Sequence, residues 1–188
     1  MKIKIEVSAR HIHLSKKDLD ILFGEGYELK PMRKLSQEGT FAAEEKIDLK
    51  FEDRVIKGVR VLGPIREETQ VELSRTECFF LKLNAPLRSS GDLEGSVGIT
   101  LIGPKGQVEL SKGVIVAKRH IHCNKKESNE IGAKEGEMVS VKVEGERSLI
   151  FNNVEVRIKD NFNLTMHIDT DEGNTSGVFN IGEGEVLK

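Results

Sequence analysis

The tripeptide His-Ile-His occurs twice in this chain, at residues 11–13 and 120–122. The 188 residues include only five histidines, and these two copies hold four of them. Each copy follows an alternating apolar stretch typical of a strand, and each precedes a residue suited to capping a helix, Ser15 or Asn124, with an acidic residue three positions later. The repeated order of strand, His-x-His and capped short helix indicates an internal duplication.

The rest of the chain alternates short apolar stretches with glycine-containing turns. This pattern predicts many short strands and two helices, at residues 15–23 and 125–131. We expect irregular structure at 27–43, a polar loop at 171–174 and a strand at 177–181. The fold class that follows is mainly β: two small β-barrels capped by short α-helices and related by internal duplication.

Composition excludes several partners. The formal net charge of −2 gives no basic field that would indicate a nucleic-acid partner. The sequence has no apolar run long enough to span a bilayer and no signal-peptide pattern, so we expect no membrane association. Two cysteines, Cys78 and Cys123, form no disulfide framework and are typical of a reducing cytoplasm.

The histidine pairs predict a metal site. Residues i and i+2 of a strand share one face, so each pair presents two imidazoles side by side, an arrangement suited to a transition metal. A single His-x-His is equally compatible with surface histidines of no function. The matched second copy favours ligands, and His167 becomes a candidate ligand beside them. Imidazole and carboxylate ligands suit zinc, with cobalt, nickel and iron as alternatives.

Two further stretches carry candidate polar side chains. Arg66 follows a Gly-Pro turn, where a guanidinium could clamp an oxyanion, and Glu72 on the next strand could supply an oxygen to a metal. Arg88 and the serines after it form a second candidate anion-binding turn. Spacing alone favours solvated loops for both stretches. Together the residues describe a metalloenzyme acting on an anionic or phosphorylated substrate, without naming its reaction.

Four motifs resemble the PduL-type phosphotransacylases, also called phosphate propanoyltransferases. They lie in the family's order at residues 8–15, 63–72, 85–91 and 119–122. The resemblance implies the reaction acyl-CoA + phosphate ⇌ acyl phosphate + CoA, with a propanoyl or acetyl group. It also implies a homodimer with two zinc ions per subunit.

The resemblance further implies a domain division. The first strand would cross over to complete the C-terminal barrel, so that residues 1–9 join 118–188 and residues 10–117 form the other barrel, with the active site between them. Family members housed in bacterial microcompartments carry an N-terminal encapsulation helix. This sequence begins at its first strand, which gives the expectation of a free cytoplasmic enzyme.

The resemblance also implies roles for individual residues at matching positions of this sequence. The resemblance places one zinc on His11 and His13, with an open position for the CoA sulfur, and assigns phosphate binding to Arg66. The ligands it implies for the second zinc are Glu72, His120, His122 and His167. The positions at which it implies contacts to coenzyme A are Ser8, Arg33, Arg60, Leu62 and Asn174.

The sequence shows no evident protein nucleophile, so the mechanistic hypothesis is direct transfer in a ternary complex. Two other readings stay open. One is a bicupin-like metal oxygenase, although cupins place a Glu soon after the histidine pair, where this chain has Lys16 and Lys17. The other is a non-catalytic barrel module with a structural zinc, a site that would be closed by four protein ligands.

Overall fold

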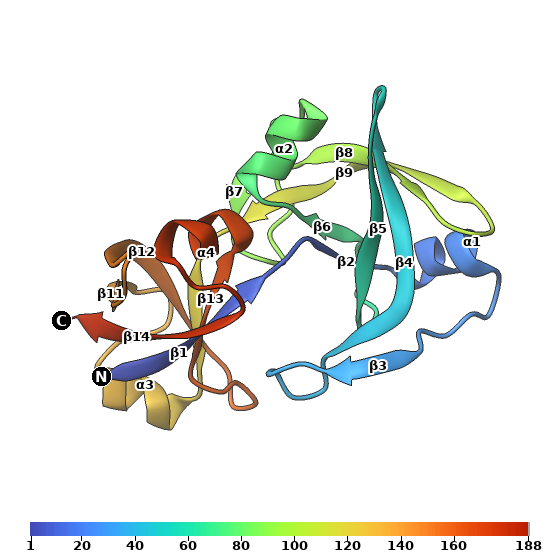
Figure 1. The fold of residues 1–188 in the computed structure, drawn as a ribbon. Coiled ribbons are helices and arrows are strands. Elements are labelled where there is room, and N and C mark those ends of the chain that lie inside the picture. The colour runs from blue at the N-terminus through green and yellow to red at the C-terminus, as the bar shows by residue number, and fades with distance from the viewer. Residues whose placement is uncertain (188) are drawn as a thin grey trace. The chain divides into compact units, whose positions relative to one another are not determined.

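The structure is a computed structural model that describes residues 1–187. The chain divides into two compact units (Figure 1). The terminal unit combines Met1–Ala9 with the chain from Lys118 onward, and the central unit is Arg10–Ala117. Each unit has its own core of buried apolar side chains and is built mainly of strands. The expected class, two β-barrels with short helices, is confirmed.

Within residues 1–187, the terminal unit is a closed barrel of six strands. Going round the barrel, they are β1 (Lys2–Ser8), β13 (Thr165–Asp169), β10 (His120–Cys123), β12 (Leu149–Ile158), β11 (Met138–Val143) and β14 (Ile181–Leu187). The first strand runs parallel to β13 and antiparallel to β14, blue between red strands in Figure 1. It therefore crosses over to complete the C-terminal barrel, as expected.

The central unit holds a second closed ring. Its described strands follow the order β3 (Pro31–Lys34), β4 (Phe41–Phe51), β5 (Arg54–Gly63), β2 (His11–His13), β6 (Gln70–Glu72), β9 (Gln107–Ala117) and β7 (Leu87–Arg88). The strand β8 (Val97–Ile102) pairs with both β4 and β9 and closes the ring. The strands β3 and β7 extend it at the edges.

Four helices occur in the described chain: α1 (Lys16–Phe23), α2 (Arg75–Leu81), α3 (Lys125–Ile131) and α4 (Thr170–Ser176). The predicted helices correspond to α1 and α3, and the side chains of Ser15 and Asn124 cap them by accepting from a backbone N–H of the first turn. The prediction missed α2 and α4. Residues 171–174 are helical, so the expected polar loop there is wrong.

A capping motif in the sequence marks the start of each missed helix. Ser74 before α2 and Asp169 before α4 each form a reciprocal capping box with the glutamate three positions later. Both helices are only seven residues long. The apolar pattern of α2 is too short to show a period, and α4 has no large apolar side chain.

Two strand expectations also fail. Residues 177–180 form the turn after α4, and β14 begins only at Ile181. The region 27–43, expected to be irregular, contains β3, whose four residues are all exposed at a sheet edge and show no alternation. Among residues 1–187, no helix combines the length and apolar character needed to cross a membrane.

Removing the side chain between the second histidine pair should destabilise the terminal barrel. Ile121 is fully buried in that core, so Ile121→Ala should lower the free energy of unfolding by about 2–5 kcal/mol. The exposed Ile150 on β12 provides the control, and Ile150→Ala should change it by less than about 0.5 kcal/mol. Urea denaturation measures both, and equal losses would contradict the assigned core.

Candidate metal centres

The first histidine pair is positioned by its strand neighbours. The strand β2 lies between β5, to which it is parallel, and β6, to which it is antiparallel. Ile12 is fully buried in the core, so the residues on either side of it point to the opposite face. The ring centroids of His11 and His13 are 5.1 Å apart, and the two residues are only 9% and 8% exposed.

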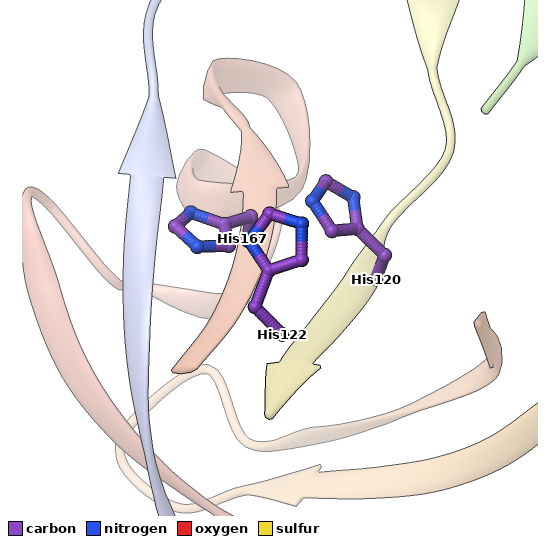
Figure 2. Close-up of side chains that lie close together, drawn as sticks. All are labelled: His120, His122 and His167. Atoms are coloured by element: carbon purple, nitrogen blue, oxygen red, sulfur yellow. The ribbon is translucent and has the colours of Figure 1, made fainter. Parts of the chain in front are cut away.

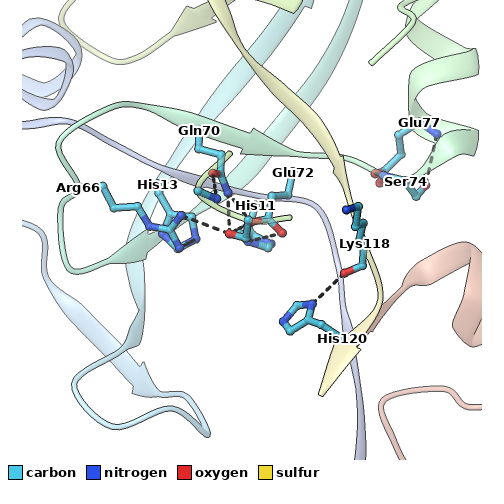
Figure 3. Close-up of polar contacts among 11 residues, drawn as sticks. His11, His13, Arg66, Gln70, Glu72, Ser74, Glu77, Lys118 and His120 are labelled. Carbon is cyan, nitrogen blue, oxygen red and sulfur yellow. Dashed lines mark hydrogen bonds and ion pairs between the residues drawn. The ribbon is translucent and has the colours of Figure 1, made fainter. Parts of the chain in front are cut away.

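Glu72 completes this group. It pairs in register with His11 across the β2–β6 ladder, and its Oε2 lies 3.4 Å from His11 Nε2 (Figure 3). The candidate ligand atoms of His11, His13 and Glu72 all lie within 4.8 Å of one another. The resemblance assigned Glu72 to the other set of ligands, whereas the structure groups it with the first histidine pair.

The protonation states of this group suit a metal. Burial alone would raise the pKa of Glu72, but His11 and then His13 outweigh it, and the pKa lies well below its ordinary value. Burial, followed by the charges of His11 and Arg66, lowers the pKa of His13 well below its ordinary value. Near neutral pH the group therefore offers an ionised carboxylate and a neutral imidazole, the forms that bind metal ions.

Arg66 lies beside the same histidine pair. Its backbone N–H donates to the carbonyl of Leu14 at 2.9 Å. Its Nη2 lies 2.9 Å from Nε2 of His13, and its Nη1 donates to the hydroxyl of Ser90 at 3.3 Å. The residue as a whole is exposed, so an anchored guanidinium lies within reach of solvent. Sequence reasoning missed Gln70, whose amide joins this cluster through Ser90 and Glu72.

The second group is built in the same way. The strand β10 lies between β12, to which it is parallel, and β13, to which it is antiparallel. His120 pairs in register with His167, as His11 does with Glu72. The duplication therefore puts His167 and Glu72 in equivalent places. Ile121 and Cys123 face the barrel core, which leaves the histidines on the other face.

The three imidazoles of this group converge, as Figure 2 shows. Ring centroids are 4.5 Å apart for His120 and His122, 4.9 Å for His122 and His167, and 5.2 Å for His120 and His167. Their candidate ligand atoms lie within 4.8 Å of one another. Three imidazoles at this spacing are a donor set typical of zinc with one open position.

The hydrogen bonding of these rings fits a metal. Both ring nitrogens of His122 are buried, and within residues 1–187 neither has a hydrogen-bond partner. Nδ1 of His120 lies 2.8 Å from the carbonyl of Lys118, which selects the tautomer with its lone pair on Nε2. Burial, then the charges of His120 and His167, lowers the pKa of His122 far below its ordinary value. A buried neutral imidazole keeps one nitrogen without a proton, and that nitrogen is suited to ligate a cation.

The residues expected to contact coenzyme A fall in both units. In the terminal unit, Ser8 ends β1 beside Asp169, and Asn174 lies on α4, where its Oδ1 accepts from Arg147 at 3.5 Å.

In the central unit, Arg33 and Leu62 both pair with Ala42 of β4, so these two residues flank the same position of β4 from opposite sides. Arg60 on β5 pairs with His11, and its Nη1 donates to the carbonyls of Ala43 and Glu44 at 2.9 Å each.

Fold and side chains together define a class: double-barrel proteins in which each barrel carries a cluster of side chains that could ligate a metal. The family model described as phosphate propanoyltransferase matches residues 4–179. The chain belongs to this family.

Relatives that bear the name phosphate propanoyltransferase cover most of the chain. One from Thermotoga maritima is 50% identical over 182 residues, which is 96% of this chain and 86% of the relative. One from Clostridioides difficile is 47% identical over 175 residues, 93% of this chain and 84% of the relative. One from Listeria monocytogenes is 45% identical over 186 residues, 99% of this chain and 87% of the relative.

The buried imidazole of His122 should make the metal-free protein sensitive to acid. Its pKa is lowered by folding, so below pH of about 6.5 the unfolded chain binds a proton that the folded chain does not. Stability should then fall with decreasing pH by about 1.4 kcal/mol per pH unit from this residue. Urea denaturation between pH 7 and pH 5 measures the slope.

His122→Gln is the matched control because it cannot titrate. Its slope over the same range should be shallower than that of the unsubstituted protein by the contribution of one histidine. Identical slopes would show that His122 is protonated in the folded state.

Proposed function

We propose that this protein is a phosphate acyltransferase that interconverts a short-chain acyl-CoA and phosphate with an acyl phosphate and coenzyme A. Membership of the phosphate propanoyltransferase family supports the reaction. The observation that carries it is the anchored guanidinium of Arg66, 2.9 Å from a buried histidine of a candidate metal group. Propanoyl and acetyl groups are both proposed substrates.

We propose two zinc ions per subunit. His11, His13 and Glu72 would hold one, and the three histidines of the terminal unit, His120, His122 and His167, would hold the other. When bound, zinc would lower the pKa of a thiol ligand and neutralise developing oxyanion charge.

Arg66 is the proposed phosphate-binding residue. Its backbone is anchored by the hydrogen bond to Leu14 and its guanidinium by Ser90, so the side chain is held before phosphate arrives. A planar guanidinium matches phosphate with two parallel hydrogen bonds. It would aim a phosphate oxygen at the thioester carbon and neutralise the same oxygen as it leaves in the reverse direction.

Direct transfer in a ternary complex is the proposed route. The two cysteines are buried, and burial, followed by Glu127, raises the pKa of the Cys123 thiol to about 11. Little thiolate of Cys123 therefore exists at neutral pH. The Ser90 hydroxyl donates to Glu72, whose low pKa makes it a weak base for activating an alcohol. Neither thiol nor hydroxyl is suited to attack the acyl group, which favours direct attack of one substrate on the other.

Two further properties are proposed from the resemblance: assembly as a homodimer and a cytoplasmic location. Sedimentation of the purified protein would measure the first, and cell fractionation the second. A monomer at micromolar concentration would remove the dimer from the proposal.

The decisive experiment follows thiol release from propanoyl-CoA and acetyl-CoA, with and without phosphate, before and after chelation and zinc return. Release that needs both phosphate and metal, with two zinc ions per subunit by elemental analysis, supports the proposal. Well-folded, zinc-loaded protein that releases no thiol would rule out the reaction. Dioxygen uptake, or a metal needed only for folding, would then favour an oxygenase or a structural zinc.

Arg66→Ala should lower kcat/KM for phosphate by about a hundredfold or more, because a charge-matched donor at the reacting oxyanion is lost. Arg66→Lys keeps the charge but not the paired geometry and should recover only part of it. Lys112→Ala, which removes an exposed ion pair with Glu68 in the same unit, should have little effect. Near-normal turnover in Arg66→Ala would remove Arg66 from the site.

The thiols should be inert in the folded enzyme. A disulfide reagent should label Cys78 and Cys123 slowly at pH 7, and labelling should become fast in denaturant, because both side chains are buried. The variants Cys78→Ala and Cys123→Ala should keep their turnover. An acyl group trapped on either cysteine by mass spectrometry would overturn direct transfer.

A further inference from the structure

The side-chain amide of Gln70 is almost completely enclosed beside the first metal group. The residue is 1% exposed and pairs with His13 across the β2–β6 ladder. Its Nε2 donates to Oε1 of Glu72 at 2.5 Å and to Oγ of Ser90 at 2.9 Å. Its Oε1 accepts from the backbone N–H of Gly91 at 2.8 Å. Both amide hydrogens and the carbonyl oxygen are therefore used.

The hydroxyl of Ser90 likewise uses all of its hydrogen-bonding positions. It donates to Oε1 of Glu72 at 2.7 Å and accepts from Gln70 and from Nη1 of Arg66. One donor and two acceptor positions are all that a hydroxyl has. The loop that carries Ser90 is itself tied to Gln70 through Gly91. The position of the hydroxyl beside Arg66 thus depends on the amide.

The two oxygens of the Glu72 carboxylate have different partners. Oε1 accepts from Gln70 and Ser90, whereas Oε2 lies 3.4 Å from His11 Nε2. A carboxylate held by one oxygen presents the other in a fixed direction, as outer hydrogen bonds do for metal ligands generally.

The other barrel has a different residue at the ladder position equivalent to Gln70. Thr165 occupies the equivalent place, opposite His122 in the β10–β13 ladder, and its short side chain carries a single hydroxyl. The equivalent of Glu72 there is His167, an imidazole rather than a carboxylate with two oxygens to tell apart. Of these two equivalent ladder positions, the one beside the carboxylate-containing group carries the amide.

We propose that Gln70 is a positioning residue that orients the metal-facing oxygen of Glu72 and, through Ser90, the phosphate-binding guanidinium of Arg66. The proposal rests on the function proposed above for that same site. One buried amide would then couple metal affinity to phosphate affinity, because removing it releases both Glu72 and the Ser90 loop.

Metal binding tests the first half without any need for activity. Cobalt(II) titration, followed by its visible absorption, would be performed in a His122→Ala background, so that only the group with Glu72 keeps all its ligands. Gln70→Met has a similar length without hydrogen-bonding groups, and it should bind cobalt 10–100-fold more weakly. Gln107→Met, an exposed glutamine of the same unit, is the matched control and should bind normally.

Kinetics of the zinc-loaded enzyme with His122 intact test the second half. Gln70→Met should raise KM for phosphate about tenfold or more while KM for acyl-CoA changes little, and Ser90→Ala should raise it in the same way. The double variant should be no worse than the poorer single variant, since both act through one hydroxyl. Ser90→Thr, which keeps the hydroxyl, should recover most of the loss.

The outcomes separate the two proposals. Unchanged cobalt affinity in Gln70→Met would overturn the positioning role, whatever the reaction. A second pattern would also overturn it: Gln70→Met lowers thermal stability, weakens metal binding and raises both KM values, while Ser90→Ala does none of these. That pattern marks a purely structural amide. Wild-type protein without acyl transfer would overturn the proposed function, yet the cobalt measurements would still decide the role of Gln70.

Discussion

The backbone ladders that hold each short histidine strand between two neighbours are the constraint on which both candidate centres depend. Three or four residues cannot set side-chain directions alone, but a parallel partner on one side and an antiparallel partner on the other leave no freedom of register. A slip of one residue would bury the imidazoles and expose Ile12 or Ile121. Burial of the apolar residue between each pair of histidines therefore directs both imidazoles to the opposite face of the strand.

The same ladders decide which residue joins each pair. Position by position, Glu72 stands opposite His11 as His167 stands opposite His120. The duplication thus produced one geometry with two ligand sets, one containing a carboxylate and one entirely imidazole. A carboxylate brings negative charge and two oxygens, and in the central unit the side chains of Gln70 and Ser90 donate to it.

Burial gives these groups their chemistry. Enclosure disfavours the charged form of an imidazole, so the pKa values of His13 and His122 are lowered and each ring keeps one nitrogen without a proton. Enclosure would also neutralise Glu72, but the adjacent histidines reverse that effect and lower its pKa. The same physics leaves Cys123 inert, since burial raises the pKa of its thiol. Burial therefore favours the protonation states that candidate metal ligands need and disfavours thiolate formation at Cys123.

The sequence by itself determined the duplication, the mainly β class, the helices that follow each histidine pair and the choice of the paired histidines as candidate ligands, because these depend on local pattern and on residue chemistry. It did not determine which pair Glu72 would join, nor the roles of Gln70 and Ser90. Those depend on strand register between residues 59 positions apart in the chain (72 − 13) and on a loop returning to β6. The seven-residue helices α2 and α4 were likewise missed, since capping boxes and tertiary packing, rather than periodicity, define them. Only the closed ladders of the tertiary structure fix contacts between residues so far apart in the chain.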